Sequence, residues 1–263
     1  MPRWLVAAVA MVALAACSDS PPTTQGTVPS LPTTVASVPT TVATVPTTVP
    51  TTVTTVATAP VSTTRLAPPV TTVPAVAFTG AVSTVTAADL GSSWREGCPV
   101  SPDGLRLLHL SYWDFDDQPR VGSLVVAASV TDVVVEVFRT LYDQHFPIRR
   151  MEPVDVYGGD DDASMAVDNT SGFNCRPAVS DGPVHWSNHA YGLAIDVNPV
   201  ENPYILNGRV LPPGGADFID RSVYRPGMAV RGGVLTSAFA DVGWGWGGVW
   251  SSPDYQHFSA NGG

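Results

Sequence analysis

Lysine is absent from this sequence of 263 residues, and all thirteen basic residues are arginine. Aspartate and glutamate number 23, so the formal net charge is −10 at pH 7. Nearly all of the acidic residues lie after residue 80. A protein that binds nucleic acid needs a basic face to meet the phosphates. The charge balance therefore argues against a nucleic-acid partner.

Cysteine is scarce, with only Cys17, Cys98 and Cys175 in the chain. The sequence has no CxxC pair, and two cysteines as far apart as Cys98 and Cys175 do not make a zinc–cysteine site. In an exported protein these two would instead suit a disulfide. Two free thiols are the alternative.

Charge is missing from most of the first 82 residues. Residues 1–17, "MPRWLVAAVAMVALAAC", have the basic start and short apolar run of an export signal, and the run is too short to span a membrane comfortably. "LAAC" matches the bacterial lipobox, which predicts a lipid on Cys17 and anchoring to the outer face of the bacterial cell membrane, facing the cell wall. The alternative is an ordinary secretory signal with an incidental cysteine.

Residues 18–82 are rich in Thr, Pro and Val, and their only charges are Asp19 and Arg65. Proline disfavours both α-helices and the hydrogen-bonded pairing of β-strands, and the segment has almost no large side chains to bury. We therefore expect a disordered, extended linker.

Residues 83–263 are long enough for one domain with a core. Apolar patterns predict strands over 105–115 and 122–130, joined by a turn. A helix over 131–146 and a further strand over 147–157 follow them. Residues 158–177 are predicted to be a long polar loop, and a short helix is expected over 235–241. Strands and helices without regular βαβ alternation favour a small α+β domain with a central antiparallel sheet.

A zinc hydrolase needs three protein ligands and an open fourth position. Of five histidines, His109 lies in an apolar strand and His145 ends a helix, where a cation suits the dipole. His185 is so close to His189 that the chain would have to bend sharply to use both. The remaining candidates are His189, Asp196 and His257.

"HAYGLAID" places His189 seven residues before Asp196, which by itself is typical either of a metal half-site or of polar residues at the rim of a core. Small residues at Gly192 and Ala194 would leave room for a substrate. In "SPDYQHF", Asp254 precedes His257 by three residues, and a carboxylate there can act as a base beside the metal. The alternative for Asp254 is a turn cap after Pro253.

"SNHAYGLAIDVNP" together with "DYQHF" resembles the zinc-dependent peptidases of family M15, which include VanY-type D-Ala-D-Ala carboxypeptidases and phage endolysins. The chain is most similar to the L-alanyl-D-glutamate peptidase branch. The resemblance implies a Hedgehog/DD-peptidase-like fold and one Zn²⁺ per domain. It also implies that His189, Asp196 and His257 are the ligands and that Asp254 is the base.

Two further roles follow from the resemblance. Arg176 in "FNCRP" is the best match to the family's substrate-binding arginine; the alternative is that it pairs with the Asp160–Asp162 run. Ser187 is expected to support the site by hydrogen bonding. The tryptophans at 244, 246 and 250 would either wall the cleft or fill the core.

The sequence thus predicts a monomeric zinc peptidase of the cell surface that cuts stem peptides of peptidoglycan. Which bond it cuts, and whether the linker is glycosylated, are not readable from the sequence. The alternative is a non-catalytic, cell-wall-binding or adhesin-like lipoprotein that keeps the fold.

Overall fold

The computed structural model describes residues 76–180 and 183–262. The predicted signal peptide with Cys17, and the linker as far as residue 75, lie outside the described residues. Within the described part, no helix has the length and apolar character needed to cross a membrane.

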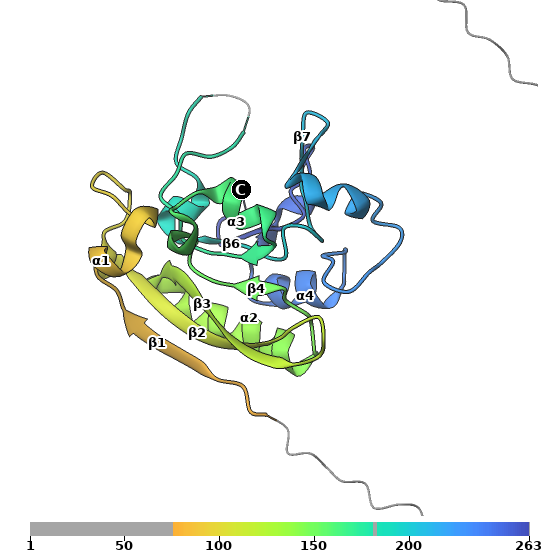
Figure 1. Cartoon of the computed structure of the whole chain (residues 1–263), viewed down its shortest axis with the longest axis horizontal. Coiled ribbons are helices and arrows are strands. Elements are labelled where there is room, and N and C mark those ends of the chain that lie inside the picture. Colours follow the sequence, from red (N-terminus) through yellow and green to blue (C-terminus); the bar gives the residue numbers. More distant parts are fainter. Residues whose placement is uncertain (1–75, 181–182, 263) are drawn as a thin grey trace, which may run out of the picture. The chain divides into compact units, whose positions relative to one another are not determined.

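The first sheet is an antiparallel layer with the order β1–β2–β3 (Figure 1). Its strands are β1 (Gly80–Thr84), β2 (Leu105–Trp113) and β3 (Pro119–Ala127). The strands predicted over 105–115 and 122–130 are present, but β3 begins earlier and gives way to a 3₁₀ turn at Ala128. β1 starts three residues before the expected domain boundary at residue 83, because its backbone pairs with β2 from Gly80 onwards.

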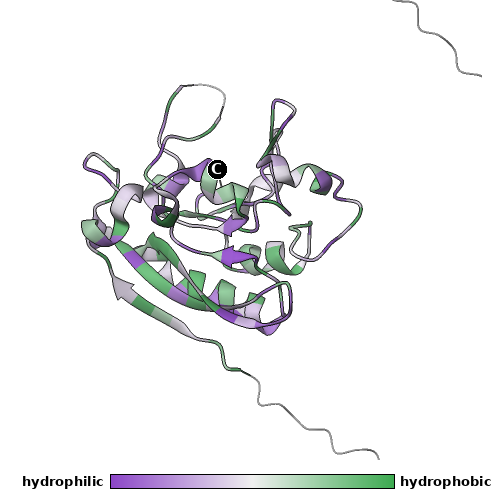
Figure 2. Ribbon diagram, viewed as in Figure 1, coloured by the Kyte–Doolittle hydropathy of each residue, from purple (hydrophilic) through white to green (hydrophobic). Residues whose placement is uncertain are grey.

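Helix α2 (Thr131–Asp143) packs against this sheet through the apolar stripe that the sequence pattern predicts, including Val134, Val137, Phe138 and Leu141. It ends three residues before residue 146, because His145 takes a left-handed conformation with φ 51°. Helix α4 (Val234–Asp241) shares the same core through Leu235 and other apolar side chains. Figure 2 shows hydrophobic residues along both helices.

The segment after α2 differs from the sequence prediction. Only β4 (Arg150–Met151) is a strand where residues 147–157 were expected to form one, and a 3₁₀ turn follows it. The predicted polar loop contains helix α3 (Asp161–Ala166) and β5 (Asn169–Thr170), which pairs in parallel with β4. The first aspartate of the run 160–162 has a local structural role. The carboxylate of Asp160 caps α3 by accepting a hydrogen bond from the backbone N–H of Ala163 at 3.0 Å.

A second antiparallel sheet has the order β6–β10–β9. Its strands are β6 (Ala194–Asp196), β9 (Gly245–Trp246) and β10 (His257–Ser259). The remaining elements are the short helix α1 (Ala87–Leu90) and a hairpin of β7 (Tyr204–Leu206) and β8 (Arg209–Leu211). The mixed α+β architecture is confirmed. However, the strands of the described residues divide among several small sheets and do not form one central sheet.

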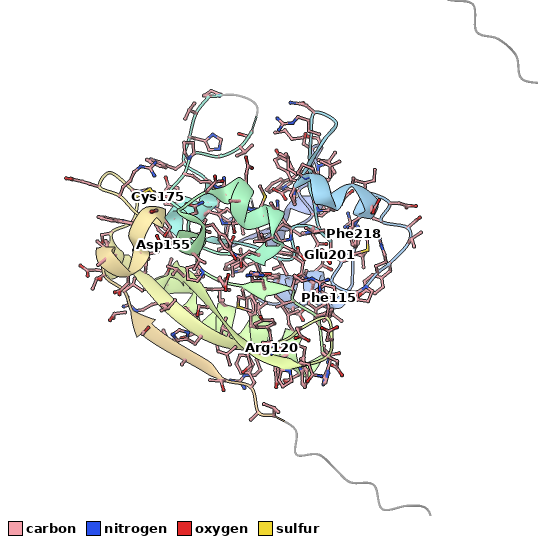
Figure 3. The ribbon with its side chains drawn as sticks, viewed as in Figure 1. Phe115, Arg120, Asp155, Cys175, Glu201 and Phe218 are labelled. Atoms are coloured by element: carbon pink, nitrogen blue, oxygen red, sulfur yellow. A yellow bond between two sulfur atoms is a disulfide. The ribbon has the colours of Figure 1, made fainter. Side chains whose placement is uncertain are left out.

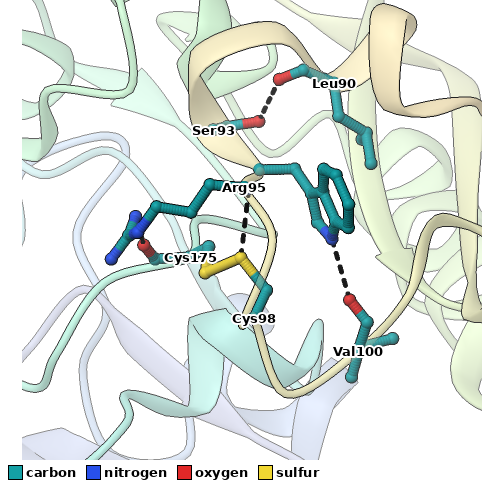
Figure 4. The surroundings of a disulfide bond; sticks show 7 residues. Leu90, Ser93, Arg95, Cys98, Val100 and Cys175 are labelled. Atoms are coloured by element: carbon teal, nitrogen blue, oxygen red, sulfur yellow. Dashed lines mark hydrogen bonds between the residues drawn. A yellow bond between two sulfur atoms is a disulfide. The ribbon is translucent and has the colours of Figure 1, made fainter.

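Cys98 and Cys175 form a disulfide with an S–S distance of 2.00 Å (Figure 4). The bridge ties the segment before β2 to the segment that leads into the second sheet. The guanidinium of Arg95 also donates to the carbonyl oxygen of Cys175 at 2.5 Å. The structure therefore has the bridged form and not the alternative of two free thiols.

Candidate active site

The second sheet brings two of the candidate ligands together. In the antiparallel pair of β6 and β10, His257 lies directly opposite Asp196. His189 comes from a 3₁₀ turn (Asn188–Tyr191) that immediately precedes β6. A short turn followed by a strand thus folds His189 back onto Asp196, while the strand pairing supplies His257 from 61 residues further along the chain.

The three side chains form a tight triangle. His189 Nε2 lies 3.0 Å from Asp196 Oδ2, and His257 Nδ1 lies 3.1 Å from Asp196 Oδ1. The two ring nitrogens are 3.2 Å apart. All three side chains are less than a tenth exposed. Among the described residues, this is the group of histidine, cysteine and acidic side chains that could hold a metal ion.

Hydrogen bonds fix which atoms face the centre of the triangle. Nδ1 of His189 lies 2.7 Å from the carbonyl oxygen of Gly172, which can only accept, so Nδ1 carries a proton and Nε2 is the nitrogen that faces Asp196 and would hold a metal ion. Burial of Asp196 opposes its ionisation. The charges and hydrogen bonds of His189 and His257 outweigh that effect and hold the pKa of the Asp196 carboxyl well below its usual range.

The donor atoms have the spacing that a small divalent cation requires. Around a tetrahedral ion with bonds of about 2.0–2.1 Å, neighbouring donor atoms lie about 3.3 Å apart. The observed separations of 3.0 to 3.2 Å are close to that value. The two oxygens of Asp196 each lie beside one of the two imidazole nitrogens, so the two rings and the carboxylate together fit a metal ion as three protein ligands.

Asp254 lies in the same cavity as the triangle. Its backbone N–H donates to the carbonyl oxygen of Gly247 at 3.1 Å, and its Oδ1 is buried without a hydrogen-bond partner among the described residues. Burial, and then the negative charge of Asp196, raise the pKa of Asp254 to about 7. A buried carboxylate oxygen with no partner can accept a proton from a reacting group, which a turn cap saturated by backbone N–H groups could not do.

Arg176 and Ser187 also line the cavity. Arg176 Nη2 lies 2.8 Å from Asp161 Oδ2, so the alternative of a pair with the aspartate run is present together with the position in the cavity. Ser187 is the N-cap of the turn that carries His189, and its Oγ accepts from the backbone N–H of His189 at 3.3 Å. Ser187 therefore helps to hold the first ligand in place.

The cavity has a volume of about 550 Å³, a size typical of small-molecule and peptide sites. One side is lined by α3 and Arg176, and another by the β7–β8 hairpin with Leu206 and Leu211. Of the three tryptophans, Trp250 lines the cavity, whereas Trp244 and Trp246 pack with the core. His185 also lies at the cavity, but His109 bonds to Ser123 on the surface of the first sheet.

Gly192 has a different role from the one that the sequence suggested. Its φ is 67°, and a Cβ there would lie 2.5 Å from the backbone nitrogen of Ala127 in β3. The same contact is a hydrogen bond, in which the N–H of Ala127 donates to the carbonyl oxygen of Gly192 at 2.9 Å. Gly192 is therefore small because the turn is left-handed and packs against the first sheet, not because bulk would block a substrate.

Sequence reasoning missed Gln256, which lines the cavity and is 2 % exposed. Its Nε2 contacts the sulfur of Met165 at 3.4 Å, and its Oε1 has no partner in the described part of the chain. Its place immediately before His257, a candidate ligand, was the only signal in the sequence.

A family model described as D-alanyl-D-alanine carboxypeptidase matches residues 180–260 of the chain. The matched segment contains the three triangle residues and Asp254. The match supports assignment of the chain to the M15 peptidases. Searches of curated proteins and of solved structures found no match.

Proposed function

We propose that this chain is a zinc-dependent peptidase that hydrolyses amide bonds in peptidoglycan stem peptides. The observation that carries the proposal is the buried triangle of His189, Asp196 and His257, which lies in a peptide-sized cavity together with Asp254, whose buried Oδ1 has no partner among the described residues. The family match supports the class of reaction and of substrate.

In this proposal Nε2 of His189, the carboxylate of Asp196 and Nδ1 of His257 hold the zinc. When bound there, Zn²⁺ supplies Lewis-acid chemistry, which makes water more acidic and polarises a carbonyl group. The two imidazoles are neutral as ligands, and the Gly172 carbonyl keeps the proton of His189 on the outward nitrogen Nδ1.

Asp254 moves the proton. Hydrolysis breaks the amide C–N bond, adds the OH of water to the carbonyl carbon and delivers a proton to the leaving nitrogen. Asp254 accepts the water's proton on its carboxylate and passes it to that nitrogen. Arg176 lies across the same cavity and offers N–H groups to a substrate oxygen.

The anchoring of the enzyme belongs to the same proposal. A lipid on Cys17 would hold the chain at the outer face of the bacterial membrane, and the Thr/Pro/Val linker would let the domain reach the cell wall. The alternative is a binding protein that keeps the fold without catalysis. An intact metal triangle with an unpartnered carboxylate beside it favours the enzyme.

Two measurements test the proposal. Metal analysis of the purified domain should find about one zinc per chain after incubation with zinc, and purified muropeptides should yield new peptide products. Asp254→Asn should bind zinc equally well yet lose at least about a hundredfold in rate. A domain that ignores added zinc, or an Asp254→Asn variant with the activity of the wild type, would overturn it.

A further inference from the structure

One backbone carbonyl holds both ends of the loop that carries Asp254. Gly247 begins a 3₁₀ turn (Gly247–Val249), and its carbonyl oxygen accepts from the backbone N–H of Trp250 at 3.0 Å and from that of Asp254 at 3.1 Å. Trp250 and Asp254 both line the cavity that contains the triangle. Residues 250–254 are thus a small loop whose two ends are joined at a single atom.

Gly247 also has no room for a side chain. A Cβ there would lie 2.7 Å from the carbonyl oxygen of Asp254, 3.1 Å from the Cβ of Asp254 and 3.0 Å from the ring of Trp250. A methyl group would therefore have to displace the backbone from which the Asp254 carboxylate extends. The aspartate side chain is short, so its carboxylate follows a shift of its backbone.

Trp246 adds a second link to the same segment. Its indole Nε1–H donates to the carbonyl oxygen of Tyr255 at 2.9 Å. Trp246 lies in β9 and is paired with Phe258 of β10, the strand that begins at His257. The links to residues 254 and 255 therefore start in the same sheet that carries two of the proposed ligands, and this sheet relates the position of Asp254 to the triangle.

We propose that Trp246 and Gly247 are positioning residues of the reaction: they hold the backbone of residues 254 and 255 so that the Asp254 carboxylate lies at a fixed place beside the triangle. Neither is among the described residues that line the cavity, so both act through Asp254. Proton transfer needs its two heavy atoms within about 2.6–3.2 Å of each other, and a misplacement of about 1 Å can cost about a hundredfold in rate. The inference rests on the proposed function, in which Asp254 moves the proton.

The kinetic test compares Gly247→Ala with Val249→Ala, a matched control in the same turn whose side chain is exposed. On a peptidoglycan stem peptide, Gly247→Ala should lower kcat at least about tenfold and keep KM and the zinc Kd within about threefold of the wild-type values. In an Asp254→Asn background the same change should cost less than about threefold, because the carboxylate that it misplaces is gone. Val249→Ala should keep the wild-type kcat.

Trp246→Phe keeps the test decisive where Gly247→Ala does not fold. It retains an aromatic ring but removes the N–H that bonds to Tyr255, and it should lower kcat about threefold to tenfold, again with little further effect in the Asp254→Asn background. Wild-type kcat in the variants that fold, or full additivity with Asp254→Asn, would overturn the inference. A loss of zinc affinity as large as the loss of kcat would overturn it too, since the segment would then hold the metal ligands and not the base.

Crystal structures separate this inference from the proposed function. In the zinc-loaded variant the Asp254 carboxylate should be displaced, while the three side chains of the triangle keep their wild-type places. Displacement in a protein whose wild type hydrolyses no stem peptide would remove the proposed function and leave the positioning contacts standing. An unmoved Asp254 carboxylate would overturn the inference whether or not the wild type hydrolyses the peptide.

Discussion

Nδ1 of His189 donates a hydrogen bond of 2.7 Å to the carbonyl oxygen of Gly172. The bond fixes the ring's tautomer and orientation, so that Nε2 faces the carboxylate of Asp196. The acceptor is a backbone atom, and its position depends on the close approach of Gly172 to strand β3. A Cβ on Gly172 would lie 2.3 Å from the backbone carbonyl oxygen of Val125 in β3.

Gly172→Ala should therefore weaken zinc binding without touching a ligand. The added methyl group must push residue 172 away from β3 and misplace the carbonyl that orients His189. Loss of such an outer partner typically costs about 10–100-fold in metal affinity. Competition with a chromophoric chelator measures the zinc Kd. Gly214→Ala, where the nearest atom to the new Cβ is 3.8 Å away, is the control and should keep the wild-type Kd. An unchanged Kd in a folded Gly172→Ala protein would contradict the role of this contact.

Zinc should also stabilise the fold. Its donors come from the turn before β6, from β6 and from β10, so a bound ion links chain segments that are far apart in the sequence. A free zinc concentration of about 100 times the zinc Kd adds about 2.7 kcal/mol to the free energy of unfolding. Thermal melts with added zinc should therefore show a higher Tm, and chelation should reverse it.

His189→Ala should abolish that zinc-dependent rise in Tm, because one of three ligands is gone. His109→Ala is the control, since His109 lies on the exposed face of β2 and bonds to Ser123. An equal response to zinc in wild type and His189→Ala would mean that zinc binds elsewhere on the protein.

The sequence predicts the members of the candidate metal site more fully than the fold. His189, Asp196 and His257 can be singled out because metal binding demands particular side chains, and the structure brings these three together through the pairing of β6 and β10. The spacing of apolar residues predicts α2 correctly, since one buried helix face leaves a periodic pattern. In contrast, α3 is not visible in the sequence: it has six residues, and its aspartate-rich start reads as a loop.

The role of Gly192 could not be read from the sequence, because it depends on a partner from a distant segment, Ala127 in β3. Residue type and spacing carry no direct record of such a pairing. The same holds for Gln256, whose importance lies in a buried oxygen without a partner among the described residues. For Arg176 the sequence did offer the pair with the Asp160–Asp162 run as an alternative, and the structure contains that pair with Asp161.

Stability should depend on pH through Glu201, which is labelled in Figure 3 and is only 3 % exposed. Burial, and then a hydrogen bond and charge repulsion from Asp168, raise the pKa of Glu201 from its ordinary value of 4.5 to about 8. Between these two values the folded chain keeps a proton that the unfolded chain releases. Stability is therefore highest at the acidic end of that window and falls as pH rises towards 8.

Glu201→Gln should remove this pH dependence, because the amide stays neutral and can still donate to Asp168. Urea unfolding at pH 5.5 and pH 9 should give a wild-type difference on the order of 2 kcal/mol larger than that of the variant. Asp103→Asn, on the exposed turn before β2, is the control for loss of one carboxylate elsewhere. Equal pH profiles for wild type and Glu201→Gln would show that the proton lies on another group.

The disulfide should contribute both to stability and to the site. Cys98 and Cys175 are separated by 77 residues, and closing a loop of that length in the unfolded chain corresponds to about 4 kcal/mol. The Cys98→Ser/Cys175→Ser double variant should therefore unfold at lower urea concentration by an amount of that order. Cys175 also directly precedes Arg176, so the bridge restrains the backbone from which the Arg176–Asp161 ion pair is built.

We accordingly expect the double variant to lose substrate affinity before it loses the metal. The three proposed ligands lie on β6, on β10 and in the turn that Gly172 contacts, none of which the bridge joins directly, so the zinc Kd should stay within about threefold of the wild-type value. KM should rise more than kcat falls, because in the proposed mechanism Arg176 contacts substrate while Asp254 moves the proton. Zinc affinity and kinetics are measured at a temperature where circular dichroism shows the variant folded. A fall in zinc affinity that parallels the rise in KM would mean that the bridge supports the whole site and not only the Arg176 side of the cavity.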